Sequence, residues 1–435
     1  MKSNLGLSMI VKNEEECLAR CLNSVESIVD EIVIVDTGSE DRTVEIARSY
    51  GAKTVNFPWN DDFGEARNVS LRHATKDWIL VLDADEVISE ADLSPLKGLT
   101  ENGNAYGYKL IQRSYSNKPN IVRWQPNPRD YPEGQDYQGY FPSPLVRLFR
   151  NDPRVYFRGK IHETVEESLI DHGLTIVHTD IPIHHYGAVR GELYFQRKLQ
   201  RYIRLERKNI EDNPRDWPSL SRLGSLYLEQ GETGKARGVF EKVMEMAPDI
   251  PEVYRGLALV CEEEGKTEEA VNVYSRAVEV NPRNAPLRYN YGKLLEKIGK
   301  LHQAVIQYKE AIRFDRDHFN SHYQLGVIYY DRGLLEEAAF HFAEVIRGYP
   351  HHAVAHHNLG AIYENSGRLE DAILEFKKAI HYQPAYETAH LSLGILLTKL
   401  NRFQEAQKEL EETLKINPRN LSALKILAYI RESQG

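Results

Sequence analysis

The sequence predicts an α/β domain over residues 1–188, followed by an all-α solenoid of helical repeats. Three observations predict this fold class. Short β-branched runs alternate with helical patterns through the first 190 residues, and no repeat is visible there. From residue 217 to residue 420 the chain repeats itself every 34 residues. With 41% hydrophobic and 27% charged residues among 435, the composition is that of globular domains.

The N-terminal region contains four predicted strands with helical segments between them. The strands are Leu7–Val11, Glu31–Val35, Lys53–Phe57 and Trp78–Leu82, and two of the helical segments are Glu14–Ser27 and Asp41–Tyr50. This alternation predicts a mostly parallel sheet that binds ligands at the carboxyl ends of its strands. No G-x-G-x-x-G or P-loop follows a predicted strand. Dinucleotide binding and nucleotide-triphosphate hydrolysis therefore have little support.

The repeats of the C-terminal half are marked by columns of small residues. Alanine recurs at 236, 270, 304, 338, 372 and 406, and glycine or alanine recurs at 224, 258, 292, 326, 360 and 394. Small residues let paired antiparallel helices approach closely, and prolines at five of the six repeat ends stop the second helix. The pattern resembles the tetratricopeptide (TPR) family. It implies six repeats over 217–420, a capping helix over 421–435, and a connecting helix or half-repeat over 189–216.

Charge and composition limit the partners. The formal net charge of −9 and the isoelectric point near 6.0 argue against a nucleic-acid partner. No run approaches the roughly 20 apolar residues of a membrane span, and the N-terminus lacks the long apolar region of a signal peptide. Three cysteines are too few for a disulfide framework. We therefore expect a cytoplasmic protein without a membrane span, and homo-oligomerisation stays open.

Three motifs follow the predicted strands in a fixed order. They are Asp36–Thr43 after the second strand, Glu65-Ala66-Arg67-Asn68, and Asp83-Ala84-Asp85 after the fourth strand. Their order and spacing resemble the family 2 glycosyltransferases, which have the GT-A (Rossmann-like) fold. The resemblance implies a nucleotide-sugar donor, and we expect a UDP-sugar. The donor-binding residues would be Val11, Asn13, Glu14, Asp36, Arg67 and Asp83.

The Asp83-Ala84-Asp85 motif suits a divalent metal ion. On an extended segment two such carboxylates point to the same side, and about 4 Å apart they would repel by roughly 4 kcal/mol without a cation. Mg²⁺ or Mn²⁺ commonly bridges carboxylates and substrate phosphates. By resemblance, Asp83 faces the ribose and the metal, Asp85 is the direct ligand, and His185 completes the metal shell. The alternative is a solvated acidic strand end.

Three later motifs resemble a branch of family 2 that includes lipopolysaccharide-core glucosyltransferases and TPR-bearing glycosyltransferases. They are Val146–Arg150, Gly159–Glu163 and Ile183–Gly187. Transfer in family 2 inverts the anomeric carbon, so a carboxylate must deprotonate the acceptor. We expect Glu163 to be this base, with Asp130 and Glu133 as lesser candidates. In the alternative interpretation, Glu163 pairs with Arg158 or Lys160, and His162 and His184 pack structurally.

An aromatic segment over 114–142 leaves two interpretations open. It contains Tyr115, Trp124, Tyr131, Tyr137, Tyr140 and Phe141. These rings would either bind sugar and acceptor groups or simply cover the sheet.

The solenoid carries three successive carboxamides at equivalent repeat positions, Asn290, Gln324 and Asn358. They would bind the backbone of an extended peptide in an acceptor groove, as in the TPR region of protein O-GlcNAc transferases, which this ladder resembles. The leading hypothesis is hexosyl or N-acetylhexosaminyl transfer to a protein or peptide. One alternative is a lipopolysaccharide or polysaccharide glycosyltransferase whose repeats bind a partner protein. Another is a TPR scaffold with a degenerate transferase domain, against which the intact Asp36, Arg67, Asp83 and Asp85 count.

Overall fold

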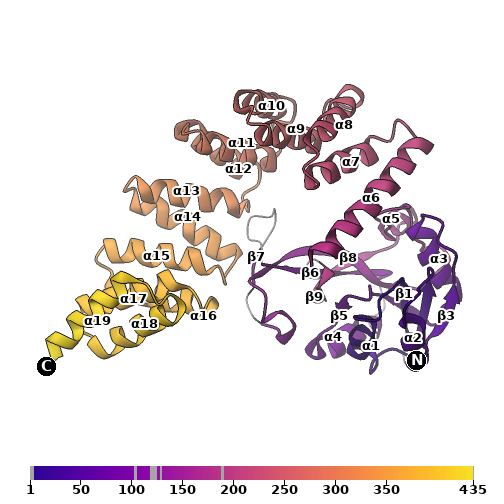
Figure 1. The fold of residues 1–435 in the computed structure, drawn as a ribbon, viewed down its shortest axis with the longest axis horizontal. Coiled ribbons are helices and arrows are strands. Elements are labelled where there is room, and N and C mark those ends of the chain that lie inside the picture. Colours follow the sequence, from indigo (N-terminus) through magenta and orange to yellow (C-terminus); the bar gives the residue numbers. More distant parts are fainter. Residues whose placement is uncertain (1–3, 102–104, 118–124, 128–129, 188–190, 435) are drawn as a thin grey trace. The chain divides into compact units, whose positions relative to one another are not determined.

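The computed structural model describes residues 4–101, 105–117, 125–127, 130–187 and 191–434. The chain divides into two compact units, residues 1–209 and residues 210–435 (Figure 1). The first unit is built on a mixed sheet and the second is entirely helical. The predicted fold class is thereby confirmed.

One nine-stranded sheet forms the centre of the first unit. Four strands on one side are parallel, and the neighbouring strand β8 runs antiparallel to β4. In sheet order the strands are β3 (Lys53–Asn56), β2 (Glu31–Asp36), β1 (Leu5–Val11), β4 (Trp78–Val81), β8 (Gly139–Arg150), β6 (Gly107–Ser116), β9 (Ile176–His185) and β5 (Glu86–Val87), with β7 (Gln125–Pro126) paired to β8. The carboxyl ends of β1, β2 and β4 therefore meet at one edge.

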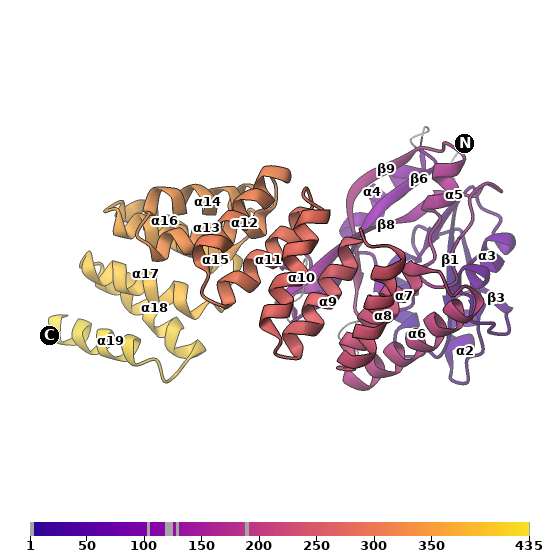
Figure 2. The ribbon, with the colours of Figure 1, turned by 90° about the horizontal axis from the view of Figure 1, so that it is seen from above.

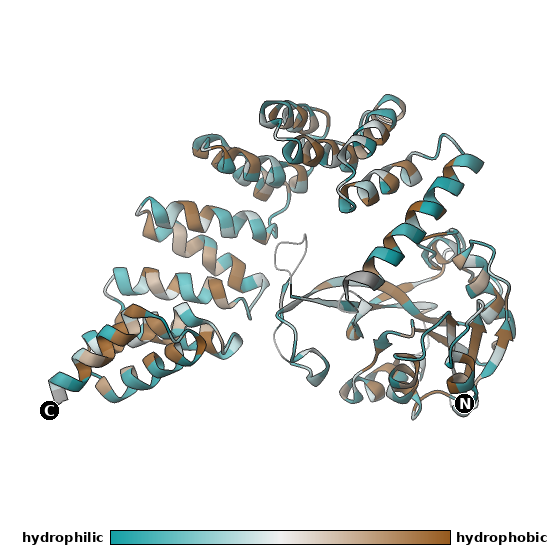
Figure 3. Cartoon of the chain, viewed as in Figure 1, coloured by the Kyte–Doolittle hydropathy of each residue, from teal (hydrophilic) through white to brown (hydrophobic). Residues whose placement is uncertain are grey.

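Six helices and a 3₁₀ turn complete this unit. They are α1 (Leu18–Val25), α2 (Thr43–Ser49), α3 (Phe63–His73), α4 (Glu90–Glu101), the 3₁₀ turn (Pro132–Gly134), α5 (Glu166–Asp171) and α6 (Glu192–Asp212). The core lies between helices and sheet and includes Leu7, Met9 and Leu80, all at most 1% exposed. Figure 3 shows this concentration of hydrophobic residues on the central strands. All four strands predicted from the sequence are present, but α1 is shorter than predicted because a turn occupies the residues before Leu18.

The second unit consists of six helix pairs and a last single helix (Figures 1 and 2). The pairs are α7 (Trp217–Glu229) and α8 (Thr233–Met246), α9 (Pro251–Glu263) and α10 (Thr267–Val280), α11 (Ala285–Lys297) and α12 (Leu301–Phe314), α13 (Phe319–Asp331) and α14 (Leu335–Gly348), α15 (Ala353–Asn365) and α16 (Leu369–Tyr382), and α17 (Glu387–Lys399) and α18 (Phe403–Ile416); the last helix is α19 (Leu421–Gln434). Within the part of the chain that the structure describes, no helix has the length and apolar character needed to traverse a lipid bilayer.

The small-residue columns perform the packing role that the sequence predicts. All six alanines, from Ala236 to Ala406, are fully buried. A Cβ atom placed on Gly326 would lie 2.9 Å from the ring of Phe342, so only glycine allows α13 to approach α14 this closely. A further glycine column, at 231, 265, 299, 333 and 367, has φ between 72° and 79° and ends the first helix of the first five repeats, and Asn401, with φ 57°, takes this place in the sixth.

A second repeated feature is a polar anchor on the first helix of five repeats. The anchor side chain donates a hydrogen bond to the backbone carbonyl six residues earlier, at the end of the preceding repeat. The anchors are Tyr254, Arg288, His322, His356 and His390. His356 is 3% exposed, and its other ring nitrogen lies 2.5 Å from the carboxylate of Glu375. Each anchor thus satisfies a backbone carbonyl at the junction between two repeats.

Replacing this anchor should destabilise the solenoid. His356→Ala leaves the buried carboxylate of Glu375 with Lys378 as its remaining cationic partner and removes the donor to Pro350. We expect the free energy of unfolding to fall by about 3 kcal/mol, because a hydrogen bond to a charged group contributes about 1.5–3 kcal/mol and one to a neutral carbonyl about 0.5–1.5 kcal/mol. Urea unfolding followed by far-ultraviolet circular dichroism measures this. The exposed His381 provides the control, since His381→Ala should leave the midpoint unchanged. Equal midpoints for both variants would contradict the anchor role.

Candidate active site

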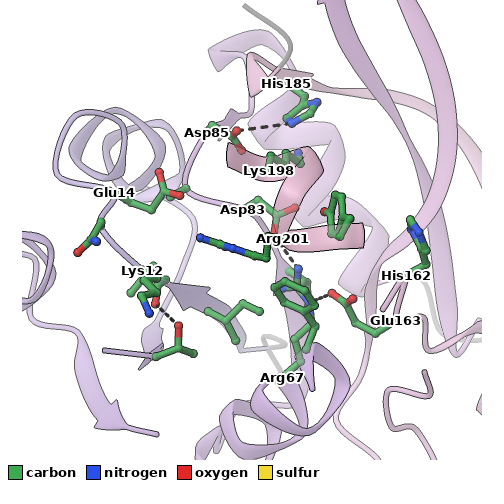
Figure 4. A pocket seen from close by; sticks show the side chains of 18 of the residues that line it. Lys12, Glu14, Arg67, Asp83, Asp85, His162, Glu163, His185, Lys198 and Arg201 are labelled. Carbon is green, nitrogen blue, oxygen red and sulfur yellow. Dashed lines mark hydrogen bonds and ion pairs between the residues drawn. The ribbon is translucent and has the colours of Figure 1, made fainter. Parts of the chain in front are cut away.

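A cavity of about 760 Å³ opens in the first unit at the carboxyl ends of β1, β2 and β4 (Figure 4). Four groups of residues line it. They are Val11–Glu16 after β1, Thr37 and Asp41 after β2, Asp83–Asp85 after β4, and residues 162–164 together with His185. The predicted motifs therefore converge on one cavity.

The loops after β1 and β2 are joined by hydrogen bonds. The amide of Asn13 donates to Ser39 Oγ at 2.9 Å, and the Asn13 side chain accepts from the amide of Glu40 at 2.8 Å. The amide of Glu14 donates to Thr43 Oγ1 at 2.7 Å. Asn13 has a φ of 55°, a conformation that asparagine tolerates better than most residues. This loop pair forms a rigid rim for the cavity.

Of the predicted donor-binding residues, Val11, Asn13, Glu14, Arg67 and Asp83 line the cavity. Asp36 differs, because it is not among the lining residues. Its carboxylate accepts hydrogen bonds from the amides of Gly38 and Ser39 and so shapes the turn after β2. Thr37 and Asp41 of the same turn reach the cavity instead.

Two buried arginines hold the carboxylates at the bottom of the cavity. Arg67 donates to Asp83 Oδ1 at 2.7 Å and to Glu163 Oε1 at 2.5 Å. Arg147 donates to Asp83 Oδ2 at 3.2 Å and to buried Glu86 at 2.9 Å. Desolvation alone would raise the pKa of Asp83, but Arg67 and Arg147 outweigh it and hold that pKa far below its ordinary value. Asp83 is therefore ionised.

The Glu65-Ala66-Arg67-Asn68 motif lies on α3 and organises the loop that carries Glu163. Asn68 binds the backbone of Phe157 twice, with Nδ2 donating to the carbonyl at 2.9 Å and Oδ1 accepting from the amide at 2.8 Å. A Cβ atom on Gly64 would lie 2.5 Å from the carbonyl oxygen of Gly159, so the loop packs directly on the first turn of α3. Glu163 thus pairs with Arg67, and Arg158 pairs with Asp171.

The Asp83-Ala84-Asp85 segment is a turn, which corrects the expectation of an extended strand end. The amide of Glu86 donates to the carbonyl of Asp83 at 3.0 Å and closes this turn. As a result the two carboxylates have different partners. Asp83 meets the arginines, and Asp85 Oδ2 lies 3.6 Å from Nε2 of His185. Pairing of β5 with β9 brings His185 beside this turn.

Asp85 and His185 have the chemistry of a two-residue metal site. Ser114 Oγ lies 2.8 Å from Nδ1 of His185, which leaves Nε2 directed at Asp85. Burial lowers the pKa of His185, but the neighbouring carboxylate of Asp85 outweighs it and raises that pKa. Among the described residues, no group of three or more His, Cys, Asp or Glu side chains is arranged to enclose a metal alone. A metal held by Asp85 and His185 would therefore need further ligands from a substrate. Carboxylate oxygens suit Mg²⁺ and Mn²⁺, and an imidazole nitrogen suits transition metals.

Helix α6 contributes cavity residues that the sequence analysis missed. Tyr194, Arg197, Lys198, Arg201 and Tyr202 all line the cavity. The ring of Tyr202 lies 5.9 Å from that of His162 and 6.5 Å from that of Phe63, measured between centroids. The sequence analysis placed this helix in a connecting segment over 189–216, whereas the compact first unit extends to Asn209. The basic residues at helical spacing directly after the last motif were the available signal.

The lesser base candidates lie elsewhere. Arg113 donates to both carboxylate oxygens of Asp130, at 2.8 and 3.1 Å, and neither residue lines the cavity. Glu133 lines a second, smaller cavity with Arg20 and Tyr186. His184, 0% exposed, packs structurally as the alternative interpretation expected, and burial lowers its pKa to about 4.

The aromatic segment mainly covers the sheet. Tyr115 is 0% exposed and Tyr140 is 8% exposed, and both pack with Tyr137 and Tyr186 in a small apolar cluster. Tyr115 also bonds Nδ1 of His184 at 2.6 Å. Trp124 lies outside the described residues. The packing of the two buried tyrosines favours the interpretation in which the segment covers the sheet.

The predicted acceptor-groove residues lie on α11, α13 and α15 and are half-buried. Gln324 lies beside Tyr289 and Asn358 lies beside Tyr323, each a tyrosine of the preceding repeat. His357 contacts the following repeat, with Nε2 3.1 Å from Ser392 Oγ. The predicted groove residues therefore stand at equivalent positions on successive repeats, with polar and aromatic neighbours between repeats.

Comparison with known proteins identifies both parts of the chain. Residues 7–163 match the model for glycosyl transferase family 2. Tetratricopeptide repeat models match residues 219–254, 260–299, 297–333, 323–390 and 366–428.

The similar proteins include a TPR protein and two glycosyltransferases. A TPR repeat-containing protein of Synechococcus elongatus is 32% identical over 259 residues, which cover 58% of this chain and 59% of the relative. The glycosyltransferase SunS of Bacillus subtilis, derived from the SPbeta prophage, is 26% identical over 47% of this chain and 45% of its own length. An uncharacterised glycosyltransferase of Rickettsia typhi is 43% identical over 24% of this chain and 37% of its own length. The chain thus spans about half the length of the first two relatives. It carries a glycosyl transferase family 2 domain, followed by tetratricopeptide repeats.

Proposed function

We propose that this chain is a metal-dependent inverting glycosyltransferase that moves a hexose or N-acetylhexosamine from a UDP-sugar to a protein or peptide. One observation carries the proposal: Asp83, Asp85, His185 and Glu163 meet in one cavity of a family 2 domain, at the strand ends where α/β sheets bind ligands. The intact ion pairs of Arg67 and Arg147 count against a degenerate domain that serves only as a scaffold.

Each cavity residue has a distinct task in this reaction. Asp85 and His185 would hold Mn²⁺ or Mg²⁺, which supplies Lewis-acid stabilisation of the departing diphosphate when bound. Arg67 keeps Asp83 ionised, and its ion pairs fix Asp83 and Glu163 in position. The Oε2 atom of Glu163 forms no hydrogen bond with the described part of the chain, and Glu163 lines the cavity. This oxygen is suited to accept the acceptor's proton as the sugar is transferred.

A direct test uses the full chain and a panel of nucleotide-sugars. We expect hydrolysis of a UDP-sugar that depends on added Mn²⁺, and a mass increase of one hexose or N-acetylhexosamine on a protein that co-purifies with the chain. An unmodified set of proteins together with modified lipid or polysaccharide would favour the other acceptor class. Absence of turnover with every donor would reject an active enzyme.

The TPR unit should determine acceptor affinity. Asn290→Ala with Asn358→Ala removes two carboxamides from the ladder without opening the core. Each lost hydrogen bond is worth about 0.5–1.5 kcal/mol, so the acceptor KM should rise about 5- to 150-fold while donor hydrolysis stays constant. Steady-state kinetics with the identified acceptor measures this. The exposed Asn272 on α10 gives the control variant Asn272→Ala. An unchanged acceptor KM would remove the peptide groove.

A further inference from the structure

Helix α6 is held against the rest of the first unit by two ion pairs with one aspartate. Arg204 donates to Oδ1 of Asp61 and Lys208 donates to Oδ2, both at 2.9 Å. Asp61 also accepts from the indole of Trp59 at 2.9 Å, and its φ of 68° places it in a strained turn before α3. This contact fixes which face of α6 meets the cavity.

That face carries three further cations, Arg197, Lys198 and Arg201, which we call the basic face. All three line the cavity. Lys198 is half-buried beside Asp85 and His185, as Figure 4 shows, whereas Arg197 and Arg201 are exposed. Unlike Arg204 and Lys208, none of the three forms an ion pair with a carboxylate of the described residues.

The two buried arginines of the cavity already have carboxylate partners, which leaves the charges of the basic face available for a ligand. Arg67 and Arg147 already form ion pairs with Asp83, Glu86 and Glu163. Lys198 of the basic face lies next to the Asp85–His185 pair (Figure 4). The ring centroid of Tyr202 lies 6.0 Å from the ammonium nitrogen of Lys198, and this contact leaves the charge of Lys198 unneutralised. Cations in a cavity that form no ion pair with a carboxylate of the described residues attract an anion and lower the free energy of a developing negative charge.

We propose that the basic face of α6 binds the diphosphate of the donor and stabilises the nucleoside diphosphate as it leaves. This inference rests on the proposed function. In the transfer step the bond between the anomeric carbon and the phosphate oxygen breaks, and its electron pair stays on that oxygen. A bond forms between the acceptor atom and the anomeric carbon, and the acceptor proton passes to Glu163. The diphosphate gains one negative charge, which the basic face stabilises.

The proposal makes α6 part of the catalytic unit. Its residues would bind the phosphates whether or not a metal is present, because they contact the anion directly. Lys198 and Arg201 are one helical turn apart, so two adjacent phosphates fit their spacing. Asp61 is then a positioning residue, acting through Arg204 and Lys208.

The test compares binding of UDP and uridine to the full chain by titration calorimetry, with Mn²⁺ and with excess chelator. Lys198→Gln with Arg201→Gln should weaken UDP binding at least about tenfold in both conditions, since each lost charge-assisted hydrogen bond is worth tenfold or more. Uridine binding should stay unchanged. Arg201→Lys alone should retain most UDP affinity, because it keeps the charge. Arg207→Gln, an exposed residue of the same helix outside the cavity lining, is the matched control.

The outcomes separate this inference from the proposed function. If the wild-type chain binds UDP and the double variant binds it equally well, the basic face does not hold the diphosphate and only this inference fails. If the wild-type chain binds no nucleoside diphosphate, the inference and the proposed function both fail. If the double variant loses uridine binding to the same extent as UDP binding, the two side chains do not act on the phosphates, and the inference is rejected.

Discussion

Asp85→Ala should abolish metal-dependent turnover of the donor while leaving the fold intact. Asp85 forms one half of the carboxylate–imidazole pair, with its Oδ2 atom 3.6 Å from Nε2 of His185. Lewis-acid stabilisation of a leaving group is worth several kcal/mol, and each 1.36 kcal/mol is tenfold in rate. We therefore expect UDP-sugar hydrolysis in the presence of Mn²⁺ to fall by at least about 10²-fold. Undiminished turnover, or full wild-type activity in excess chelator, would remove the metal site.

Two further variants make this result specific. Ser114 Oγ contacts Nδ1 of His185 at 2.8 Å, so Ser114→Ala removes the group that orients the imidazole. Loss of such a supporting hydrogen bond weakens metal binding about 10- to 100-fold, which a Mn²⁺ titration of activity would record as a higher midpoint. Asp249→Ala removes an exposed carboxylate of the second unit and should change neither value.

The fold was largely predictable because its signals are local. Each parallel strand is a short apolar run, and each repeat carries its small residues at fixed spacing. The buried alanines and the glycine opposite Phe342 show why the 34-residue period must be so regular. The start of α1 and the Asp83–Glu86 turn were less predictable, because hydrogen bonds between neighbouring loops and within the turn decide them.

The site was predictable only where a motif contains the residue itself. Asp83, Asp85 and His185 stand in such motifs, and the structure brings all three to one cavity. The pairing of Arg67 with Glu163 joins residues 96 apart, and that of Arg147 with Asp83 joins residues 64 apart. The spacing of residues along the sequence does not indicate contacts between residues so far apart. The basic face of α6 was missed for a related reason: a helix adjoining a repeat region resembles a connector until its neighbours are known.

Glu163→Gln should lower the rate of sugar transfer by about 10² to 10⁴, because glutamine cannot accept the acceptor's proton. The variant keeps the size of the side chain and an oxygen that accepts the hydrogen bond from Arg67. In the unchanged chain this bond joins Arg67 Nε to Glu163 Oε1 at 2.5 Å. Asp83 should therefore stay in place, and the donor affinity should hardly change. Single-turnover transfer to the identified acceptor and calorimetric UDP binding measure the two quantities. Glu167→Gln, an exposed site on α5, is the matched control.

The ion pair with Arg67 gives Glu163 two alternative roles. Glu163 is either the catalytic base or a residue that holds Arg67 in position, and the Glu163→Gln variant distinguishes the two. If Glu163 holds Arg67 in position, it acts through Asp83 and the donor, so its loss would weaken UDP binding and transfer together. If Glu163 is the base, it acts on the acceptor alone, so its loss would leave UDP binding unchanged and slow only the transfer. If binding and transfer fall together, the base must be sought at Asp130 or Glu133. Asp130 would then have to leave Arg113, and Glu133 would have to act from the smaller cavity. Both requirements favour Glu163, the carboxylate that already lines the donor cavity.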